Sequence, residues 1–356
     1  MTDAVNALTD RWPALGRIPR VDLGVVPTSV HALSDVSQRL DAGVWVKRDD
    51  ASAPRYGGNK VRKLEFVLAE ARAAKADTLI TFGAVGSHHV FATALYGREQ
   101  GHEVHAVLTP QPYHPHVDSQ LRADVAVGAR LHSARSLGEA LRKATRLALG
   151  ARLRRSRPFV IPPGGSNVAG TLGCVNAGVE LAAQIDAGQC PDPAAVYVAC
   201  GTCATAAGIA LGLAACGVHT KVVAVRVVDR LMCNRLSLSR LVRGAESFLR
   251  SVDAHFPEVA GQALASLEID HGEFAPGYGA SSPACEAAQY LGRLEGLAFD
   301  PTYTGKAFAS LLRHAEGKRR GQNLLFWHTL SSAPLEPFLV DQPEAPEQFV
   351  RLMTLA

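Results

Sequence analysis

The stretch Tyr56-Gly57-Gly58-Asn59-Lys60, followed by Val61-Arg62-Lys63-Leu64-Glu65, places a lysine where a glycine-containing loop turns into a helix. The two glycines let the backbone approach a ligand closely, and the free amides of a helix start favour an anionic group. Cationic neighbours such as Arg62 and Lys63 are expected to lower the pKa of Lys60, and a neutral lysine can attack an aldehyde to form a Schiff base. Taken alone, this spacing fits an ordinary surface lysine better, because lysines near helix ends are common.

The Lys60 segment resembles the Schiff-base loop of the D-cysteine desulfhydrase and 1-aminocyclopropane-1-carboxylate deaminase family, which are pyridoxal-phosphate enzymes of the tryptophan-synthase-β fold. Segments that resemble this family occur in order along the chain: Val44-Trp45-Val46-Lys47-Arg48-Asp49-Asp50, Gly83-Ala84-Val85-Gly86-Ser87-His88-His89, Pro163-Gly164-Gly165-Ser166-Asn167 and Phe299-Asp300-Pro301-Thr302-Tyr303-Thr304-Gly305-Lys306. Each match is weak alone, whereas several in one order are specific. The resemblance implies pyridoxal 5'-phosphate as cofactor, joined to Lys60.

Short apolar runs alternate with Ala- and Leu-rich helical patterns, which predicts an α/β fold of mostly parallel sheets covered by helices. The expected strands are Val44 to Val46, Thr78 to Phe82, Val104 to Leu108, Phe159 to Ile161, Val196 to Ala199 and Val222 to Val227. The expected helices are Val61 to Ala74, Val90 to Gln100, Thr171 to Ile185 and Thr205 to Ala215. The resemblance implies two domains: residues 1–62 and 171–356 form a large cofactor-binding domain, and residues 63–170 form a small inserted one.

Composition fits a soluble enzyme, with 356 residues, 47% of them hydrophobic, and a formal net charge of +4. We expect no membrane span, because no apolar run is long enough, and the start Met1-Thr2-Asp3-Ala4-Val5-Asn6 lacks the features of a signal peptide. A cytoplasmic location follows, in which the seven cysteines are reduced thiols. Nucleic-acid binding is not expected, since no aromatic residues lie among the basic ones of the stretch Arg142, Lys143, Arg146, Arg152, Arg154, Arg155 and Arg157.

The segment Val198-Ala199-Cys200-Gly201-Thr202-Cys203-Ala204-Thr205 predicts a strand, a small-residue loop and a helix, whose amides could hold a phosphate. It falls on the family's glycine-rich phosphate loop, so the resemblance implies cofactor contacts from Gly201, Thr202, Cys203, Ala204 and Thr205. Cys200 and Cys203 also form a C-x-x-C pair, which leaves a thiol redox protein as a function of a different class. No second pair of ligands completes a zinc site, and we expect no metal.

Ser87, His88 and His89 follow a predicted strand and should lie at a helix start, where amides suit a carboxylate. As isolated residues, the serine is a helix cap and the histidines are ordinary polar contacts. The resemblance implies that Ser87 lies near the reacting carbon, that all three help to bind the substrate, and that His88 contacts the cofactor. His88 replaces the family's usual asparagine and Gly86 its glutamine, which alters the pocket.

Tyr278, in Ala275-Pro276-Gly277-Tyr278-Gly279, and Tyr303 match the family's two active-site tyrosines, which implies catalytic and substrate-binding roles. A phenol can donate a proton to a carboxylate or leaving group, or accept one if it is deprotonated. Asn59, Thr304 and Thr329 are the remaining cofactor contacts that the resemblance implies; as isolated residues the two threonines are turn residues.

Threonine at position 304, where the deaminase commonly has glutamate, favours β-elimination, because a hydroxyl supports the electron sink less than a carboxylate facing the pyridine nitrogen. Leu330 and Ser331 replace a usual pair of glycines. The resemblance therefore implies a lyase that takes a small amino acid, with Lys60 removing the α-proton, and releases a 2-oxo acid and ammonia. For D-cysteine the products are pyruvate, sulfide and ammonia. The cyclopropane deaminase reaction, another pyridoxal-phosphate rearrangement and a non-catalytic cofactor-binding protein remain alternatives, and a homodimer is implied.

Overall fold

The computed structural model describes residues 6–274, 276–341 and 344–354. Contacts divide the chain into two compact units: the first comprises Met1–Lys63 and Ser166–Ser332, and the second Leu64–Gly165 and Ala333–Ala356. The domain division implied by the resemblance counts residues 333–356 with the large domain, and that division stays a prediction. The described residues do not include Met1 to Val5, on which most of the expectation about a signal peptide rests. They also do not include Ala275 of the Tyr278 motif.

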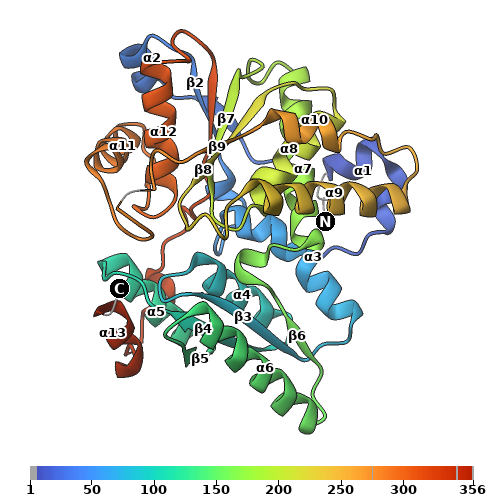
Figure 1. The fold of residues 1–356 in the computed structure, drawn as a ribbon, viewed down its shortest axis with the longest axis vertical. Coiled ribbons are helices and arrows are strands. Elements are labelled where there is room, and N and C mark those ends of the chain that lie inside the picture. Colours follow the sequence, from blue (N-terminus) through green and yellow to red (C-terminus); the bar gives the residue numbers. More distant parts are fainter. Residues whose placement is uncertain (1–5, 275, 342–343, 355–356) are drawn as a thin grey trace. The chain divides into compact units, whose positions relative to one another are not determined.

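The first unit contains a six-stranded sheet in the order β1-β2-β10-β7-β8-β9 (Figure 1). Its strands are β1 (Val30–Ala32), β2 (Val44–Lys47), β7 (Ala195–Cys200), β8 (Lys221–Arg226), β9 (Leu267–Asp270) and β10 (Leu324–Trp327). Only β1 runs antiparallel to its neighbour among the described strands. The carboxyl ends of β2, β7 and β10 therefore lie at one edge of the sheet, where α/β folds place their ligands.

Helices cover both faces of this sheet. They are α1 (Ala7–Arg11), α2 (Ser34–Leu40), α7 (Val168–Asp186), α8 (Ala204–Ala215), α9 (Arg235–Val252), α10 (Ala260–Ser266), α11 (Pro283–Leu294) and α12 (Thr304–Glu316), with 3₁₀ turns at Pro13–Arg17 and Asp49–Ala51. On one face α12 packs its Phe308 and Leu311 against Val46 and Tyr197 of the strands. On the other face α8 contacts β7 and β8 and carries α7. Burial on both faces explains why all six residues of β7 are apolar and buried.

Helix α7 is long and apolar enough to cross a membrane, so the expectation that the chain has no such run is wrong by length and composition. However, 78% of its apolar window is buried inside the protein. Glycines let it pack closely on α8: a Cβ on Gly178 would lie 2.6 Å from the Ile209 carbonyl oxygen, and one on Gly212 would lie 2.3 Å from the Val175 carbonyl oxygen. The helix is apolar because it is a core helix.

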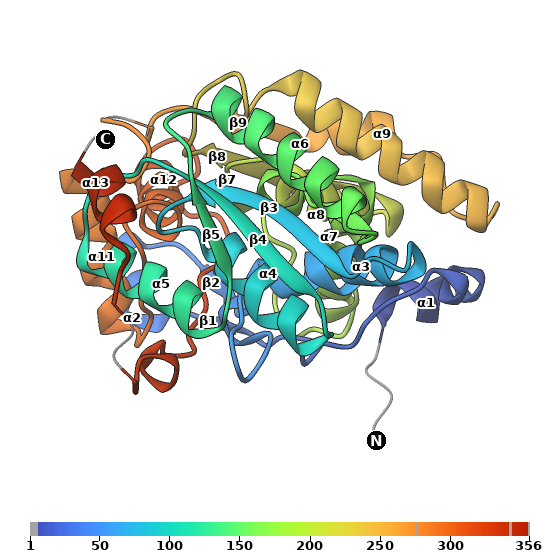
Figure 2. The same cartoon turned by 90° about the horizontal axis from the view of Figure 1, so that it is seen from below.

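The second unit contains a four-stranded parallel sheet in the order β5-β4-β3-β6, whose strands are labelled in Figure 1 and seen from below in Figure 2. Its strands are β3 (Thr78–Ala84), β4 (Glu103–Thr109), β5 (Arg130–Ser133) and β6 (Pro158–Val160). Its helices are α4 (His88–Glu99), α5 (Pro115–Ala126), α6 (Leu137–Leu153) and α13 (Glu347–Thr354), with 3₁₀ turns at Pro163–Gly165 and Glu336–Phe338. Helix α6 lies on one face and α4 on the other, where α13 inserts Phe349 and Leu352 beside Val85 and Val90. Helix α3 (Asn59–Ala73) begins in the first unit and ends in the second.

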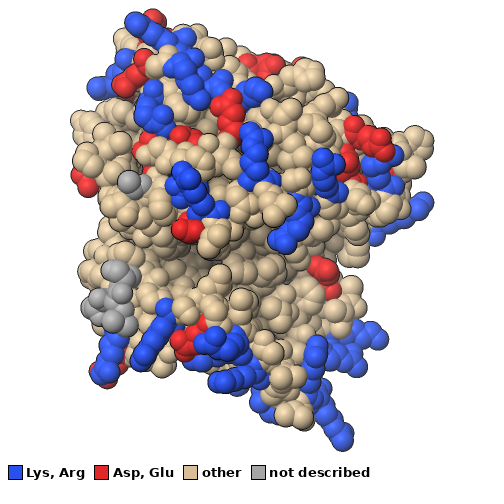
Figure 3. All heavy atoms as spheres, viewed as in Figure 1, with Lys and Arg blue, Asp and Glu red and all other residues tan. Residues whose placement is uncertain are grey.

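Every strand and helix expected from the apolar runs is present, with ends within three residues of those predicted. The apolar runs do not predict four further short strands, which are β1, β5, β9 and β10. The basic stretch on and after α6 is exposed, apart from half-buried Lys143, and Figure 3 shows Lys and Arg side chains where α6 lies at the lower edge. A solvated helix face accounts for it.

Candidate active site

The loop before Lys60 needs both of its glycines. Gly58 has a φ of 91°, which disfavours other residues, and a Cβ there would lie 2.6 Å from the carbonyl oxygen of Thr329 after β10. A Cβ on Gly57 would lie 2.1 Å from the carbonyl oxygen of Asp50. Ser331, which stands where the family has glycine, accepts a hydrogen bond from the Gly57 amide over 2.9 Å. The glycines thus allow the loop to pack directly on the segment after β10.

Asn59 joins three segments of the first unit. Its backbone amide donates to the Thr329 carbonyl oxygen over 3.3 Å, and its side-chain amide donates to the hydroxyl of Thr205 over 2.9 Å. Thr205 lies in the first turn of α8. The side chain of Asn59 is 6% exposed, so this hydrogen bond is shielded from water. The start of α3, which carries Lys60, is therefore fixed to the predicted phosphate loop.

Lys60 lies in the first turn of α3 and keeps partial exposure. Burial of its surroundings, with a smaller contribution from the positive charge of Lys63, lowers the pKa of Lys60 to about 7. A lysine with this pKa is about half neutral amine at pH 7, far more than an ordinary lysine. Such an amine can act as a nucleophile toward an aldehyde and as a proton acceptor.

Arg62 does not act on Lys60, contrary to the expectation from its nearness in sequence. Residues two apart in a helix point in nearly opposite directions. Arg62 is buried and its guanidinium donates to Asp49 over 2.7 and 2.9 Å and to Glu180 over 2.9 Å. Glu180 on α7 also pairs with buried Lys47, and Asp49 accepts from the Trp327 indole over 2.7 Å. This buried charge network fixes the start of α3 to α7 and to the ends of β2 and β10.

The loop from Gly201 to Cys203 has free backbone donors. Among the described residues, no partner accepts a hydrogen bond from the amides of Gly201, Thr202 or Cys203. Cys203 precedes α8 with a φ of 72°, and a left-handed residue in such a loop turns successive amides toward one point. These three free amides lie directly before a twelve-residue helix and are suited to hold a phosphate, whereas the Ala204 amide, also predicted as a contact, donates to the Thr202 carbonyl oxygen over 3.0 Å.

Two residues extend this loop. The hydroxyls of Ser166 and Thr202 share a hydrogen bond of 2.6 Å. Ser166 belongs to the Pro163-Gly164-Gly165-Ser166-Asn167 segment, and its sequence alone does not predict this contact. The ring of Tyr303 lies beside the loop, because a Cβ on Gly201 would be 3.6 Å from its Cε1 atom. The phosphate loop, the start of α3 and one predicted tyrosine therefore lie together in the first unit.

Tyr278 and Tyr303 form a pair, as their shared family match suggests. Their hydroxyls share a hydrogen bond of 2.8 Å and their rings meet edge to face, with centroids 5.9 Å apart. Burial raises the pKa of Tyr278 to about 12 and that of Tyr303 well above its usual range. Both phenols are therefore protonated at neutral pH. They can donate protons, and the raised pKa values favour this role over that of a proton acceptor.

Thr304 uses its hydroxyl inside the protein. It donates to the Asp300 carboxylate over 2.7 Å and accepts from the Asp300 amide over 2.8 Å, and its side chain is fully buried. Asp300 also accepts from the amides of Thr302, Tyr303 and Thr304, and so caps α12. This geometry favours a structural role for Thr304. The hydroxyl of Thr329, by contrast, makes no hydrogen bond to another described residue, and its side chain is partly exposed.

In the second unit, Ser87 is the N-cap of α4 and accepts from the Val90 amide over 3.4 Å. Gly86 precedes it, and a Cβ there would lie 2.8 Å from a methyl group of Val117 on α5. The close approach of α5 explains why glycine replaces the family's glutamine. The buried side chain of Gln111 accepts from the Gly86 amide over 3.2 Å. Gln111 therefore brings a side-chain amide to this turn from a different segment, which sequence reasoning missed.

The two histidines after Ser87 differ. His88 is partly exposed, and its Nε2 atom lies 3.1 Å from Nε2 of His116 on α5, with the rings 4.7 Å apart. His89 is buried, and its ring nitrogens contact the hydroxyls of Thr81 and Thr93 at 3.0 and 3.5 Å. His88 can contact a ligand, whereas the geometry of His89 favours a structural role.

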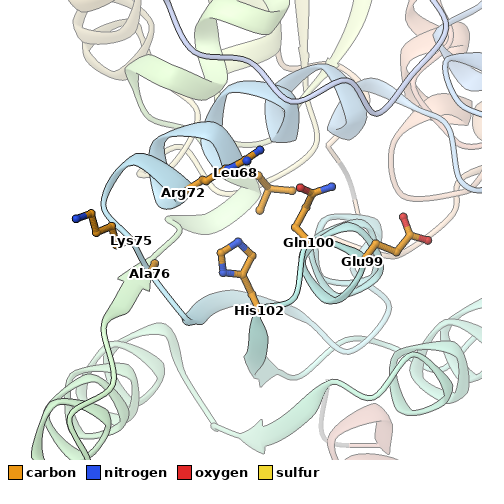
Figure 4. Close-up of a pocket in the computed structure, with 7 residues that line it drawn as sticks. All are labelled: Leu68, Arg72, Lys75, Ala76, Glu99, Gln100 and His102. Atoms are coloured by element: carbon orange, nitrogen blue, oxygen red, sulfur yellow. The ribbon is translucent and has the colours of Figure 1, made fainter. Parts of the chain in front are cut away.

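Figure 4 shows a different pocket of the second unit, of about 450 Å³. It lies at the carboxyl end of α4, whereas Ser87 and His88 lie at its amino end, roughly 18 Å away for twelve residues. It contains none of the predicted site residues. It is lined by Leu68, Arg72, Lys75, Ala76, Glu99, Gln100 and His102.

Known proteins similar to this chain have names that agree with the chemistry of these residues. A family model described as pyridoxal-phosphate dependent enzyme matches residues 21–329. A Klebsiella pneumoniae protein named D-cysteine desulfhydrase is 33% identical over 323 residues, 88% of this chain and 94% of its own. A Pyrococcus furiosus protein, provisionally named 1-aminocyclopropane-1-carboxylate deaminase, is 32% identical over 88% of this chain and 92% of its own.

A crystal structure of an ACC deaminase homologue superposes with a TM-score of 0.75 at 27% identity, covering 97% of this chain and 98% of its own. A threonine deaminase isoform from Solanum lycopersicum superposes with a TM-score of 0.61 at 16% identity and supports the fold alone. The tryptophan-synthase-β-like fold, known as fold type II, is confirmed.

Proposed function

The chain belongs to the family of pyridoxal-phosphate-dependent enzymes, and we propose that its reaction is the α,β-elimination of a small amino acid, as in a D-cysteine desulfhydrase. It is a lyase or deaminase whose cofactor is pyridoxal 5'-phosphate. The residues of the first unit fit that cofactor. The free amides of Gly201, Thr202 and Cys203 would hold its phosphate, and Lys60 would take its aldehyde.

The lowered pKa of Lys60 is the observation that carries this proposal. An amine with a pKa of about 7 can both give up and take a proton at neutral pH, as the transfer of an α-proton requires. Its position is fixed by Asn59, which is hydrogen-bonded to the first turn of α8. When bound, pyridoxal phosphate supplies an aldehyde and a ring that stabilises negative charge on the substrate's α-carbon. Lys60 would remove the proton from that carbon.

The tyrosine pair would act on the leaving group. Tyr278 and Tyr303 are protonated and share one hydrogen bond, so one of the two hydroxyls keeps a free proton to donate. A thiolate that leaves from the β-carbon would accept that proton. In the second unit, the resemblance assigns Ser87 to the substrate, and His88 and Gln111 add polar groups near its turn.

The overall reaction for D-cysteine consumes one water and gives pyruvate, hydrogen sulfide and ammonia. Deamination of 1-aminocyclopropane-1-carboxylate would instead give 2-oxobutanoate and ammonia. The residue type and the hydrogen bonds at position 304 support elimination rather than opening of the substrate's cyclopropane ring. Position 304 offers no carboxylate, and the nearby Asp300 carboxylate is occupied by the cap of α12. A weaker electron sink suffices when the leaving group is a good one, such as a thiolate.

The test is to incubate the purified holoenzyme separately with D-cysteine, L-cysteine and 1-aminocyclopropane-1-carboxylate. We expect pyruvate and sulfide in equal amounts from D-cysteine, together with a shift of the visible cofactor band. 2-Oxobutanoate as the main product would identify the deaminase alternative. A stable cofactor band without product from any of the three would support a non-catalytic cofactor-binding protein.

The Cys200→Ser variant separates the thiol hypothesis from this proposal. Elimination through Lys60 does not need the Cys200 thiol, so we expect the variant to keep its cofactor band and most of its activity. Loss of activity with an unchanged band would favour thiol chemistry.

We also propose that the enzyme is a cytoplasmic homodimer that binds neither membrane nor nucleic acid. The family resemblance supports the dimer, and the free state of all seven cysteines in the structure fits a reducing compartment. Light scattering coupled to gel filtration checks the mass, which is 37.7 kDa for one chain.

A further inference from the structure

Three cysteine sulfurs meet behind the phosphate loop. The Sγ atoms of Cys200 and Cys203 are 3.9 Å apart, those of Cys233 and Cys200 are 3.4 Å apart, and all three lie within 4.8 Å of one another. Cys200 ends β7 and Cys203 precedes α8, whereas Cys233 comes from the turn before α9. The third cysteine is the residue that a C-x-x-C pair lacks, and it is 30 residues further along the chain.

The sulfurs of Cys200 and Cys203, 3.9 Å apart, have the spacing of two ligands on one metal ion, and a small shift of the Cys233 side chain, now 3.4 Å from Cys200, would let it join them. Bonds of ~2.3 Å from a metal to thiolate sulfur, at tetrahedral or trigonal angles, separate the sulfurs by roughly 3.8 to 4.0 Å. A disulfide would require about 2.05 Å between two of the sulfurs and would leave the third without a role. The side chains are also 2% exposed or less, and such burial suits a closed structural site.

We propose that Cys200, Cys203 and Cys233 bind a thiophilic metal ion with a filled d shell, Cu⁺ or Zn²⁺. Three thiolates around either ion leave a net negative charge. Burial lowers the pKa of Lys63, but negative charge on Cys200 and Cys203 favours its charged form, so metal-bound thiolates would be compensated by a positive charge beside them. The Met232 carbonyl oxygen, 3.7 Å from the Cys203 sulfur, is a candidate fourth ligand for Zn²⁺, whereas Cu⁺ accepts three sulfurs alone.

The position of Cys203 connects this site with the phosphate loop. Its backbone amide is one of the free donors of the loop, while its side chain belongs to the sulfur cluster. A bound metal would therefore hold the left-handed conformation of Cys203, which is otherwise strained for a residue with a Cβ. The metal site itself does not depend on the reaction proposed above.

The experiment uses full-length holoenzyme that has been reduced, stripped with a chelator, loaded with either Zn²⁺ or Cu⁺, and separated from free metal. We expect about one ion per chain to be retained by the wild-type protein. We expect the Cys233→Ser variant to bind the ion at least about tenfold more weakly, because it loses a ligand. The matched control is Cys216→Ser, which removes a half-exposed thiol at the far end of α8.

X-ray absorption of the metal-loaded wild-type protein tests the site without depending on whether a variant folds. Three sulfur neighbours at ~2.2 to 2.3 Å would support the site for Cu⁺, and three sulfurs with one oxygen would support it for Zn²⁺. Retention of less than a tenth of an ion per chain, coordination by nitrogen and oxygen only, or full binding in Cys233→Ser would overturn the proposal.

Discussion

The side-chain amide of Asn59 donates a hydrogen bond of 2.9 Å to the hydroxyl of Thr205. Because Asn59 directly precedes Lys60, and Thr205 follows the loop with the free amides, this bond sets the position of the reactive amine relative to the phosphate site. Both partners are buried. Neither is close to the other in sequence, and the bond ties α3 to α8 within the first unit.

We expect Asn59→Ala to weaken binding of pyridoxal phosphate by the apoenzyme. Loss of one buried hydrogen bond, with its partner hydroxyl left unpaired, costs about 1 to 2 kcal/mol, or roughly five- to thirtyfold in affinity. Fluorescence titration measures the dissociation constant. The control is Thr205→Ser, which keeps the hydroxyl and should bind almost as the wild type does. An unchanged constant in Asn59→Ala would mean that the bond has no role in binding.

The pKa of Lys60 predicts how the apoenzyme captures its cofactor at different pH values. Only the neutral amine attacks an aldehyde, and Lys60 has a pKa of about 7. We expect the rate of capture to fall about tenfold per pH unit below 7 and to level off above ~8. Lys63 adds positive charge near Lys60, so Lys63→Met should move this inflection to higher pH. Lys318→Met, which removes an exposed charge, should not. An inflection near the ordinary lysine value in the wild type would contradict the lowered pKa.

Because both phenols are buried, we expect kcat to stay constant at the alkaline end of its pH profile. Burial raises the pKa of Tyr278 to about 12 and also raises that of Tyr303 well above its usual range. We therefore expect no loss of kcat from ionisation of either tyrosine between pH 8 and ~10. Tyr303→Phe should lower kcat by about a hundredfold, the usual scale for a lost general acid, and leave the visible cofactor band in place. A fall in kcat near pH 10 that disappears in Tyr278→Phe would show that a phenol ionises there.

The local sequence was sufficient to predict a structural feature where one segment contains all the residues that define it. The Gly57-Gly58-Asn59-Lys60 loop and the β7 loop are each defined by glycines and small residues between an apolar strand and a helix, and the structure has both. The resemblance assigned both Tyr278 and Tyr303 to the active site, and the structure brings the two together.

The features that the sequence did not predict depend on contacts between segments that are far apart along the chain. Cys233 meets Cys200 because the turn before α9 folds back on the end of β7, and Gln111 and His116 reach the Ser87 turn from before and within α5. The side chain of Arg62, by contrast, points away from Lys60 because of helical geometry, and this could have been predicted from the sequence.

The contact between Gly86 and Val117 predicts a rescue by a second substitution. Gly86→Ala places a Cβ 2.8 Å from a Val117 methyl group, and such overpacking costs about 1 to 3 kcal/mol. We expect the melting temperature to fall by several degrees. Val117→Ala should be destabilising alone, because it leaves a cavity, but in the double variant it should restore part of the lost stability. Additive losses in the double variant would show that the two side chains do not meet. Calorimetry on all four proteins completes the cycle.

Replacing Thr304 with glutamate would not by itself convert the enzyme into a cyclopropane deaminase. Thr304 is fully buried, and its hydroxyl donates to the Asp300 carboxylate, so a glutamate there would place a second carboxylate against the first. Like charges this close destabilise one another, and the cap of α12 beside Tyr303 would loosen. We expect Thr304→Glu to lower activity on D-cysteine at least about tenfold and to give no activity on 1-aminocyclopropane-1-carboxylate.

Thr304→Ser is the matched control for that variant, because it keeps the hydroxyl on the Asp300 carboxylate and should retain activity on D-cysteine. Kinetics with both substrates and the melting temperature of each variant separate a chemical effect from unfolding. If Thr304→Glu folded normally and deaminated 1-aminocyclopropane-1-carboxylate, the bond to Asp300 would have to be replaceable. The side chain at position 304 would then reach the cofactor after all.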